Sequence, residues 1–577
     1  MSLSVILNTA AAALTNTEFK IAVTNTNVAN ANETSYSRKV VSSAAITSTA
    51  ALTVSTTNRV ADSYLTKLTT SSAADSARDQ AISSALTTYD AALGTVDGGD
   101  DLSSRLGHLQ TALANLSSSG ADSASKAAAV AAATTLAGAI QGLSSTVQSL
   151  RTQANSDIAS TVNEINAQTS TIASLNRQIV AADASGGDPT DLEDQRDAAL
   201  QTLAGDIGVS YFVGPDNRMQ VYTSSGDLLV GDQANALAYT AASTLSASAS
   251  YPGQISGIAL GGRDITTSVS SGKLGGLISL RDSTLVLEQD KLDAFSSALI
   301  SATNAVTNTG SAYPPPASLT GVASLDPGQA LSGLGTLRVT VTDSSGTVAS
   351  STDLDLSSYG TVGDLVAALN NIPGLSAQLD SQGRLSLQTA NAAQGVALAD
   401  IGASVGAPGQ GVSAYFGLND LFIGSSASDI AVNPMITKAL DSLPTGQLST
   451  ASTLGAGDIA VASGDTTTTD ALSAAFGAAR TFTAAGDLPT QSTSLLSYAT
   501  DFVSSAANVV AAASSAADAS SAVFTTAQAR QQNFSNVNTN EELAQLTSLQ
   551  QQYDANAQMI TTARQMFQAL QNMMSAT

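Results

Sequence analysis

The sequence has 577 residues and a formal net charge of −24, and only 12% of its residues are charged and 4% aromatic. This length fits about three or four domains, and the acidic balance argues against binding to nucleic acid or to anionic membrane surfaces, because it repels phosphate groups. The absence of Cys excludes disulfides, thiolate metal sites and Cys nucleophiles together.

The N-terminal segment has apolar residues at a seven-residue spacing, which is the period of a coiled coil. The first column is Leu7, Leu14, Ile21 and Val28, and the weaker second column is Leu3, Ala10, Thr17 and Thr24. The first basic residue is Lys20, and Asn8 interrupts the apolar run, so we expect no cleavable signal peptide. No window approaches the roughly 20 consecutive apolar residues of a membrane span, so we expect none.

An asparagine-rich stretch, "NVANANETSYSRKVV" at residues 27–41, follows this pattern. It contains no His or Cys and a single carboxylate, Glu33, so it does not look like a catalytic set. Asn27, Asn30 and Asn32 are typical of a helix end followed by turns, and a place in an interface is compatible with that role. We predict that the N-terminal helix ends here and gives way to an extended connection.

Periodic apolar residues farther along the chain predict the long helices of an elongated bundle. They are Leu102, Leu106, Leu109, Leu113 and Leu116; Ile158, Val162 and Ile165; Ile172, Leu175 and Ile179; and Leu496, Val503, Val510, Ala517 and Phe524. The segment "SGGDP" at residues 185–189 breaks the pattern, and another helical segment covers residues 275–306.

Two tracts between these helices alternate like strands. Val209, Tyr211 and Val213 alternate before the turn "GPDN", and the tract from about 311 to 469 contains the hairpin signals "DSSG" and "DSQGRLSL". The prolines of "YPPP" at residues 313–316 predict a stiff boundary. The order helix, strand, helix, strand, helix favours a rod built from both chain ends with β domains inserted in its middle.

The C-terminal segment repeats the seven-residue period. One column is Leu546, Tyr553, Ile560, Phe567 and Met574, and the other is Leu549, Asn556, Ala563 and Leu570. The shared period predicts that the two chain ends lie side by side as coiled-coil arms. Burying a large apolar side chain contributes roughly 1.5 to 3 kcal/mol, whereas ordering each residue costs about 1 to 2 kcal/mol. With Thr, Asn and Ala in the columns, we expect the arm pair to need neighbouring molecules to complete its core.

The predicted fold class is therefore α+β and multidomain: an elongated helical rod made from both chain termini, with terminal coiled-coil arms, a helical bundle and inserted β domains. The predicted domains are the arms, 1–57 and 536–577; the helical rod, 58–205, 272–310 and 470–535; a small β region, 206–271; and an outer β-rich domain, 311–469.

Several stretches resemble flagellar proteins. "NVANANETSYSRKV" resembles the segment that follows the first helix of flagellar rod, hook and hook-associated proteins, and residues 535–574 resemble their C-terminal arm. "LNRQIVAADASGGDPTDLEDQRDAALQTLAGDIGV", "VYTSSGDLLVGD" and "GKLGGLISLRD" are similar to the FlgK family of hook-associated proteins, which form the hook–filament junction. Where the flagellar families usually have Thr-Pro-Gly before the tyrosine, this chain has Glu33, Thr34 and Ser35.

The resemblance implies a non-enzymatic structural subunit, without cofactor or metal, that is exported to the extracellular flagellum. It implies that the arms line an inner tube, that Tyr36 and Arg38 help seat them against neighbouring subunits, and that the β domains face outward. The implied partners are the hook protein, copies of the same chain, the second junction protein and a cytosolic export chaperone that grips the C-terminal arm. The predicted assembly interface consists of Leu7, Leu14, Ile21, Val28, Asn27, Asn30, Tyr36, Arg38, Leu546, Tyr553, Ile560, Phe567 and Leu570.

Other functions remain as alternatives. A hook protein or another axial subunit shares the asparagine-rich signature, and residues 172–232 favour the junction protein over these. A secreted S-layer or adhesin protein fits the acidic, Cys-free composition but needs no paired terminal heptads. An extracellular hydrolase is disfavoured because no carboxylate pair or nucleophile constellation stands out. The charges of "EDQRD" at residues 193–197 are interpreted as a solvated helix face with local ion pairs.

Overall fold

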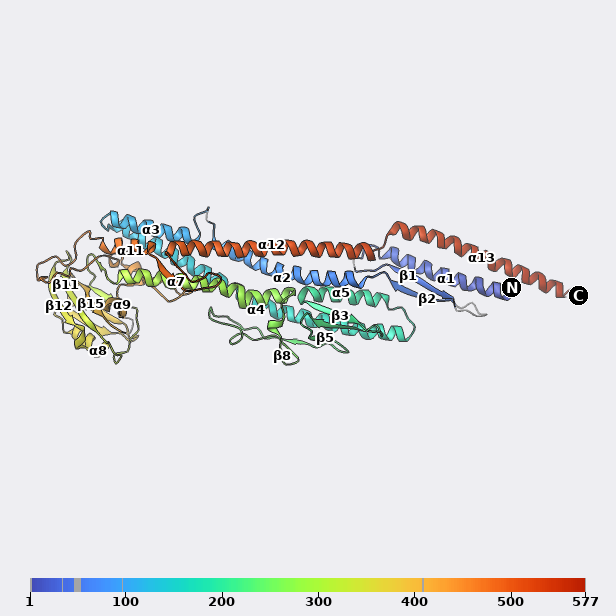
Figure 1. Cartoon of the computed structure of the whole chain (residues 1–577), viewed down its shortest axis with the longest axis horizontal. Helices are drawn as coiled ribbons and strands as arrows, with labels where there is room; N and C mark the ends of the chain where they lie inside the picture. The colour runs from blue at the N-terminus through green and yellow to red at the C-terminus, as the bar shows by residue number, and fades with distance from the viewer. Residues whose placement is uncertain (1–2, 34, 46–52, 96, 407–408, 576–577) are drawn as a thin grey trace.

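The computed structural model describes residues 3–33, 35–45, 53–95, 97–406 and 409–575. It shows an elongated molecule in which a helical rod lies between a pair of terminal helices at one end and a β-rich domain at the other (Figure 1). Both chain termini lie beyond the same end of the rod. The predicted α+β multidomain class is confirmed, and so is the expectation that the two chain ends lie side by side.

The arms are two helices from opposite ends of the chain. Helix α1 (Leu3–Ala29) packs against α13 (Thr539–Ser575). An antiparallel hairpin of β1 (Lys39–Ala45) and β2 (Thr53–Arg59) lies against α1. This hairpin falls within residues 1–57, for which the sequence predicts a coiled-coil arm and an extended connection but no paired strands. Its strands "KVVSSAA" and "TVSTTNR" are rich in Val and Thr, whose branched side chains favour strands.

The rod consists mainly of long helices. They are α2 (Ser63–Leu93), α3 (Leu102–Ser118), α4 (Ser123–Ala184), α5 (Thr190–Asp206), α6 (Gly272–Ser279), α7 (Leu285–Thr307), α11 (Thr467–Gly477) and α12 (Leu495–Ser535). Side-chain oxygens of Asp62, Asp101 and Asp122 accept backbone N–H groups at the starts of α2, α3 and α4. Helix α4 ends at the predicted break, where Gly186 has a φ of 73°, a conformation that favours glycine.

The rod's core forms where the periodic apolar residues meet. The leucine series of α3 is buried as predicted, and so are the isoleucines Ile158, Ile165, Ile172 and Ile179 of α4. Helix α4 packs against α3, α5, α6 and α7. It is also long and apolar enough to cross a membrane by length and composition alone, but 44% of that apolar window is buried inside the protein. Most of the buried apolar residues of α4 belong to the hydrophobic core of the rod.

A single π-helical turn, Leu280–Thr284, joins α6 to α7. Its buried Arg281 donates to the hydroxyl of Tyr239 (2.6 Å) and to the carboxylate of Asp282 (2.7 Å). The buried Arg151 of α4 donates to the carbonyl oxygens of Arg281 (3.0 Å) and Ala249 (2.6 Å). These two guanidinium groups fasten the loop around residues 239–249 to the rod.

The small β region packs against α4, and its strand β3 (Val209–Val213) also contacts α2. It contains two three-stranded antiparallel sheets, β3-β4-β5 and β6-β7-β8. Their strands are β3 (Val209–Val213), β4 (Met219–Thr223), β5 (Leu228–Val230), β6 (Leu237–Ala238), β7 (Ala259–Leu260) and β8 (Arg263–Asp264), followed by a short 3-10 helix, Thr266–Ser268.

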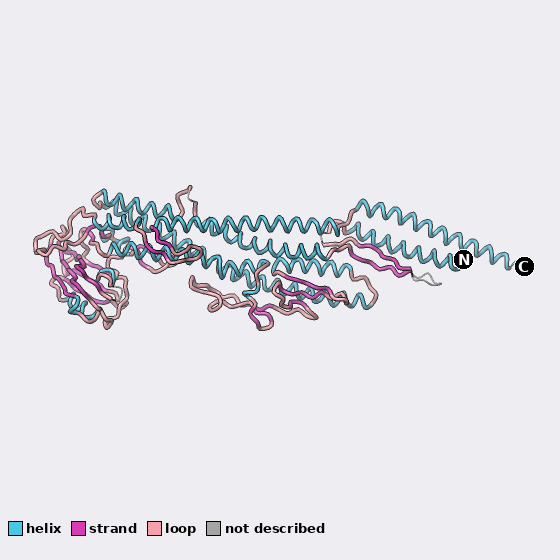
Figure 2. Tube along the Cα trace, in the orientation of Figure 1, coloured by secondary structure: helices cyan, strands magenta, loops and turns pink. Residues whose placement is uncertain are grey.

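The outer β-rich region has a hydrophobic core of its own. Its two three-stranded sheets have the orders β12-β11-β15 and β10-β14-β13, and Figure 2 shows most of the strands gathered at this end. The strands are β9 (Ser311–Ala312), β10 (Ser318–Thr320), β11 (Leu334–Asp343), β12 (Val348–Asp355), β13 (Leu375–Leu379), β14 (Leu385–Thr389), β15 (Gln394–Ser404), β16 (Phe422–Ile423), β17 (Ala431–Val432) and β18 (Pro444–Gly446). The short helices are α8 (Val362–Asn370), α9 (Val412–Phe416) and α10 (Pro434–Lys438), with 3-10 turns at Leu356–Ser358 and Leu440–Ser442.

One further hairpin interrupts the C-terminal part of the rod. Strands β19 (Arg480–Phe482) and β20 (Gln491–Thr493) pair between α11 and α12, inside the range 470–535 for which the sequence predicts helix. Gly486 turns this hairpin with a φ of 59°, and the neighbouring Asp487 accepts the ammonium group of the buried Lys291 (2.8 Å). The domain boundaries drawn from the sequence remain a prediction.

Candidate assembly interface and its joint with the rod

The two arms meet along a narrow inner seam. Its covered residues are Ala10, Thr17 and Thr24 on α1 and Leu549 and Ala563 on α13. Most of these side chains are small, and the distance between two packed helices depends on the side chains at their contact. The two arm helices can therefore approach closely along the seam.

The larger apolar residues of the predicted interface flank this seam. Half-buried positions on the two helices are Leu7, Leu14, Ile21, Val28, Leu546, Tyr553 and Ile560. The weaker of the two seven-residue columns of α1 is thus the more deeply buried one. The stronger column keeps part of its apolar surface exposed along both edges of the arm pair.

The last turns of α13 extend beyond α1, as Figure 1 shows at the C-terminus. Asn27 of α1 contacts Glu542 of α13, so at about 1.5 Å per helical residue Leu3 lies level with the turn of α13 near Met566. Beyond that level Phe567 is 58% exposed and Leu570 is 50% exposed. These two predicted interface residues therefore present bare apolar surface in the single chain.

A buried hydrogen-bond network joins the arms to each other. Asn27 donates from its amide nitrogen to Glu542 Oε2 (3.0 Å) and to the carbonyl oxygen of Lys39 (2.9 Å). Its amide oxygen accepts from the Lys39 backbone N–H (2.9 Å) and from the Tyr36 hydroxyl (2.8 Å). Arg38 Nε donates to Glu542 Oε1 (2.7 Å). We call these five residues, Asn27, Tyr36, Arg38, Lys39 and Glu542, the joint.

The joint also contacts the end of the rod. The backbone N–H of Arg38 donates to the carbonyl oxygen of Ser535, the last residue of α12 (2.8 Å). The Tyr36 ring lies under the ammonium group of Lys39, 5.0 Å from its centroid. Burial raises the pKa of Tyr36, and the nearby carboxylates Asp191, Asp194, Glu542 and Asp188 raise it further. The phenol therefore keeps its proton and remains a donor to Asn27.

The structure gives the asparagine-rich stretch an intrachain role. Asn27 and Tyr36 lie in the joint, and Asn30 donates from its side chain to the carbonyl oxygen of Thr26 (3.0 Å) at the end of α1. The backbone N–H of Tyr36 donates to the carbonyl oxygen of Glu33 (3.1 Å), which closes the turn that lacks the usual Thr-Pro-Gly. A contact of Tyr36 and Arg38 with neighbouring subunits remains a prediction.

The first turns of α5 present carboxylates to the hairpin. Arg59 at the end of β2 donates to Glu193 (2.7 Å), Asp194 (2.9 Å) and Asp197 (2.8 Å). Arg196, the basic residue between them, is buried and donates to the carbonyl oxygen of Asn217 (2.6 Å). The charges of "EDQRD" therefore bind a distant arginine, and the interpretation as a solvated face with local pairs is wrong.

Burial and charge oppose each other in this cluster. Burial lowers the pKa of Arg59, but Asp197, Asp194 and Glu193 outweigh it, so this pKa stands above its ordinary value. Burial raises the pKa of Asp194 although Arg59 and the Ser37 N–H act in the opposite direction. The guanidinium group stays charged, and its position depends on the carboxylates around it.

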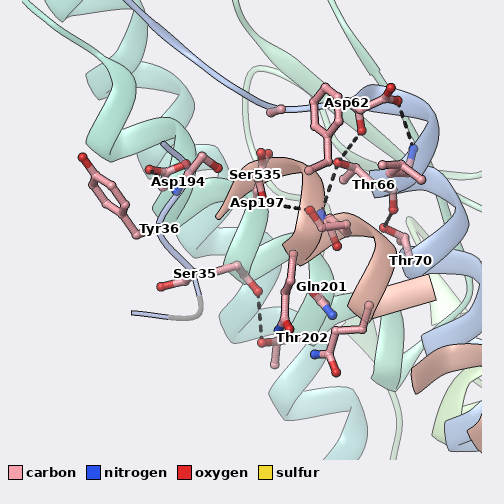
Figure 3. Close-up of a pocket in the computed structure, with 18 residues that line it drawn as sticks. Ser35, Tyr36, Asp62, Thr66, Thr70, Asp194, Asp197, Gln201, Thr202 and Ser535 are labelled. Carbon is pink, nitrogen blue, oxygen red and sulfur yellow. Dashed lines mark hydrogen bonds between the residues drawn. The ribbon is translucent and has the colours of Figure 1, made fainter. Parts of the chain in front are cut away.

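A polar groove of about 280 Å³ opens between α2, α5, α12 and residues 35–37 (Figure 3). Its three lining carboxylates already have partners, because Asp62 caps α2 and Asp194 and Asp197 bind Arg59. Gln201, Gln531 and several hydroxyl groups complete the lining. Across the part of the chain that the structure describes, no three His, Cys, Asp or Glu side chains are arranged to hold a metal ion.

Several residues of this region escape prediction from the sequence alone. Glu542 is one of two adjacent glutamates, and Lys39 and Arg59 lie on strands that the periodicity does not reveal. Basic residues at the two ends of a Val- and Thr-rich segment are the available signal. It does not identify the carboxylates of α5 as partners.

Two protein-family models match parts of this chain. Residues 86–314, which run from α2 to the start of the outer domain, match the flagellar hook-associated protein FlgK helical domain. Residues 528–573, which cover most of α13, match the C-terminal domain of the flagellar basal body rod FlgEFG proteins. No curated protein sequence matches the chain significantly.

A solved structure, that of the flagellar hook junction protein FlgK from Burkholderia pseudomallei, is similar at 19% sequence identity and a TM-score of 0.48. The alignment covers 81% of this chain and 99% of that one. The two matched family models cover different parts of the chain, the rod and the C-terminal arm, and the rod model is specific to hook-associated proteins. The chain belongs to the FlgK family of flagellar hook-associated proteins.

Proposed function

We propose that the chain takes its place at the junction of hook and filament through its two terminal arms. The junction role itself follows from the family, whose members are structural subunits of the bacterial flagellum. The helical-domain match favours a hook-associated protein over the S-layer, adhesin and hydrolase alternatives, and also over a hook or rod protein.

The observation that supports it is the apolar surface that the arms leave exposed. Phe567 and Leu570 lie bare beyond the start of α1, and the column of Leu7, Leu14 and Ile21 is covered only in part. Contiguous exposed apolar surface marks sites of protein association. Neighbouring arms would remove it from water at roughly 25 cal/mol for each Å².

The chain assembles with other axial proteins of the flagellum and acts outside the cell, as its family does. We propose more specific partners: the hook protein, further copies of this chain, the second junction protein, and a cytosolic export chaperone that binds the amphipathic α13. We also propose export without a cleavable signal peptide, and a purely structural role without catalysis. The bonded carboxylates of the groove in Figure 3 are consistent with a structural role.

The test is a strain that lacks this protein, complemented either with the full chain or with residues 1–534. We expect bare hooks and filament protein in the medium from the deletion strain, rescue by the full chain, and no rescue by the truncated one. The purified truncated chain should keep the circular dichroism of a folded helical rod. Normal filaments on the deletion strain would contradict the junction role, and collapse of the truncated rod would contradict the separate role of the arm.

A further inference from the structure

The base of the β1–β2 hairpin contains two opposed cations. Lys39 and Arg59 are partners in the first rung of the antiparallel ladder. Like charges directly opposite each other on a sheet are destabilising. The rung is therefore poorly paired by itself and needs anions from elsewhere.

Helix α5 supplies those anions. Arg59 binds Glu193, Asp194 and Asp197 at 2.7 to 2.9 Å, and the Lys39 ammonium group binds Asp191. The four carboxylates lie in the first two turns of α5, so one helix end neutralises both cations of the rung. Charged pairs that are partly buried are screened by salt much less than exposed ones, and the Arg59 side chain is only 12% exposed.

The body of the hairpin is fastened to α1. Ser43 and Ser55 are partners across the ladder, and both donate to Asn16 Oδ1 at 2.9 Å. Asn16 lies near the middle of α1 (Leu3–Ala29), so the hairpin grips the arm well away from its root. The hairpin thus links the middle of an arm helix to a helix of the rod.

A second link between arms and rod lies elsewhere. Helices α12 and α13 are joined by residues 536–538, and the Arg38 N–H contacts the end of α12. Helix α2 packs against both α12 and α5, so it lies between this link and the attachment of the hairpin to α5. A single link would let the arms rotate about it relative to the rod, whereas two separated links hold the arms in one direction.

We propose that the β1–β2 hairpin is a strut that sets the direction of the arms relative to the rod, locked by Arg59 and Lys39 on the carboxylates of α5. Arg59 and Lys39 are positioning residues in this account. The strut acts within a single chain, so it can be tested without assembly, and its failure leaves the proposed junction role untouched.

The direction of the arms can be measured by the distance between two spin labels. The chain has no Cys, so Thr9→Cys on α1 and Thr171→Cys on α4 provide the only attachment points, and both positions are exposed. Pulsed electron spin resonance on the full-length monomer then gives the distribution of the distance between arm and rod. We expect one narrow distribution from the otherwise unchanged chain.

Removing the ion pairs between Arg59 and the carboxylates of α5 should make the distribution of arm-to-rod distances at least twice as broad. Arg59→Gln does so from the hairpin, and the isosteric pair Asp194→Asn and Asp197→Asn does so from α5. Arg59→Lys retains the charge and should reverse at least half of the increase in the width of the distribution. The matched control is Arg530→Gln, which removes an exposed arginine of α12 near the joint and should leave the distribution unchanged.

Four results would contradict the proposal. If the distance distribution of Arg59→Gln were as narrow as that of the unchanged chain, the ion pairs of Arg59 would not set the direction of the arms. Equal broadening in the Arg530→Gln control, or no recovery with Arg59→Lys, would remove the charge-specific basis. Loss of helical circular dichroism in the Asp194→Asn, Asp197→Asn variant would show that the cluster maintains the rod itself.

Discussion

Arg38 and Glu542 are 504 positions apart in the sequence and form one ion pair of 2.7 Å, in which Glu542 is buried and also accepts a hydrogen bond from Asn27. The pair closes the chain into a structure whose two ends are held at one point. Through it the direction of α13 depends on residues that follow α1. The same point touches the last residue of α12, so it is also one of the two links between the arms and the rod.

Replacing Glu542 should therefore loosen the start of α13. In Glu542→Gln the buried side chain loses its charge, and its bond with Arg38 weakens at a local cost of about 1 to 3 kcal/mol. We expect faster hydrogen exchange over residues 539–556 and an unchanged melting temperature of the rod. Hydrogen exchange measured by mass spectrometry checks this. The adjacent Glu541→Gln, at an exposed position on the same turn, is the control and should exchange like the unchanged chain.

Close packing of α6 on α2 gives a second prediction. A Cβ atom on Gly276 would lie 2.6 Å from the carbonyl oxygen of Arg78, a backbone atom that cannot easily move away. Gly276→Ala should therefore destabilise the rod by about 1 to 3 kcal/mol, as overpacking does. Gly138→Ala on α4 meets open space and should be neutral or slightly stabilising. Thermal melts of the two variants decide between these effects, and equal melting temperatures would show that α6 has room to shift.

Asp206, the last residue of α5, predicts a pH dependence. Its pKa is raised from 3.8 to about 6, first by burial and then by Glu164, against the opposing effect of Lys273. A carboxyl group with a raised pKa in the folded state stabilises fully below its unfolded value, and this contribution is lost as the pH rises through about 6. The Asp206→Asn variant should therefore be as stable as the unchanged chain at about pH 4. At about pH 7.5 its free energy of unfolding should be higher, by on the order of 1 kcal/mol after allowance for solvent screening.

The control for this titration is Asp518→Asn on α12, where the carboxylate is exposed. Its melting temperature should differ little from that of the unchanged chain at both pH values. If Asp206→Asn gave the same difference in melting temperature at both pH values, the group would not titrate in this range.

The sequence predicts most of the long helices well because their apolar residues repeat at a fixed spacing and are buried together, although Leu496 of the α12 series is 37% exposed. The leucine series from Leu102 to Leu116 and the break at Gly186 are examples. The heptads also predict that the two ends pair. They do not show which column lies inside, because this depends on how closely α1 and α13 approach, and Ala10, Thr17 and Thr24 permit a closer approach than Leu7 or Leu14.

The partners of isolated charges are the part that the sequence does not reveal. Arg59 contacts three carboxylates more than 130 positions away, and nothing in the spacing along the chain indicates such a pairing. The β1–β2 hairpin is missed for a related reason. Its strands are short and rich in Ser and Ala as well as Val and Thr, so the strand signal is weak until the strands lie against α1.

The last prediction concerns the exposed end of α13. Phe567 lies beyond the cover of α1, so Phe567→Asp should hardly change the melting of the monomer, whereas in an assembled wall it would bury an unpaired charge at a cost of several kcal/mol, roughly 3 or more. We expect loss of motility. Gln551→Asp, at an exposed position on the same helix, should melt and swim normally. Monomer melting and motility are measured together for both variants. Early melting of Phe567→Asp, or normal swimming by both, would show that this surface does not enter the assembly.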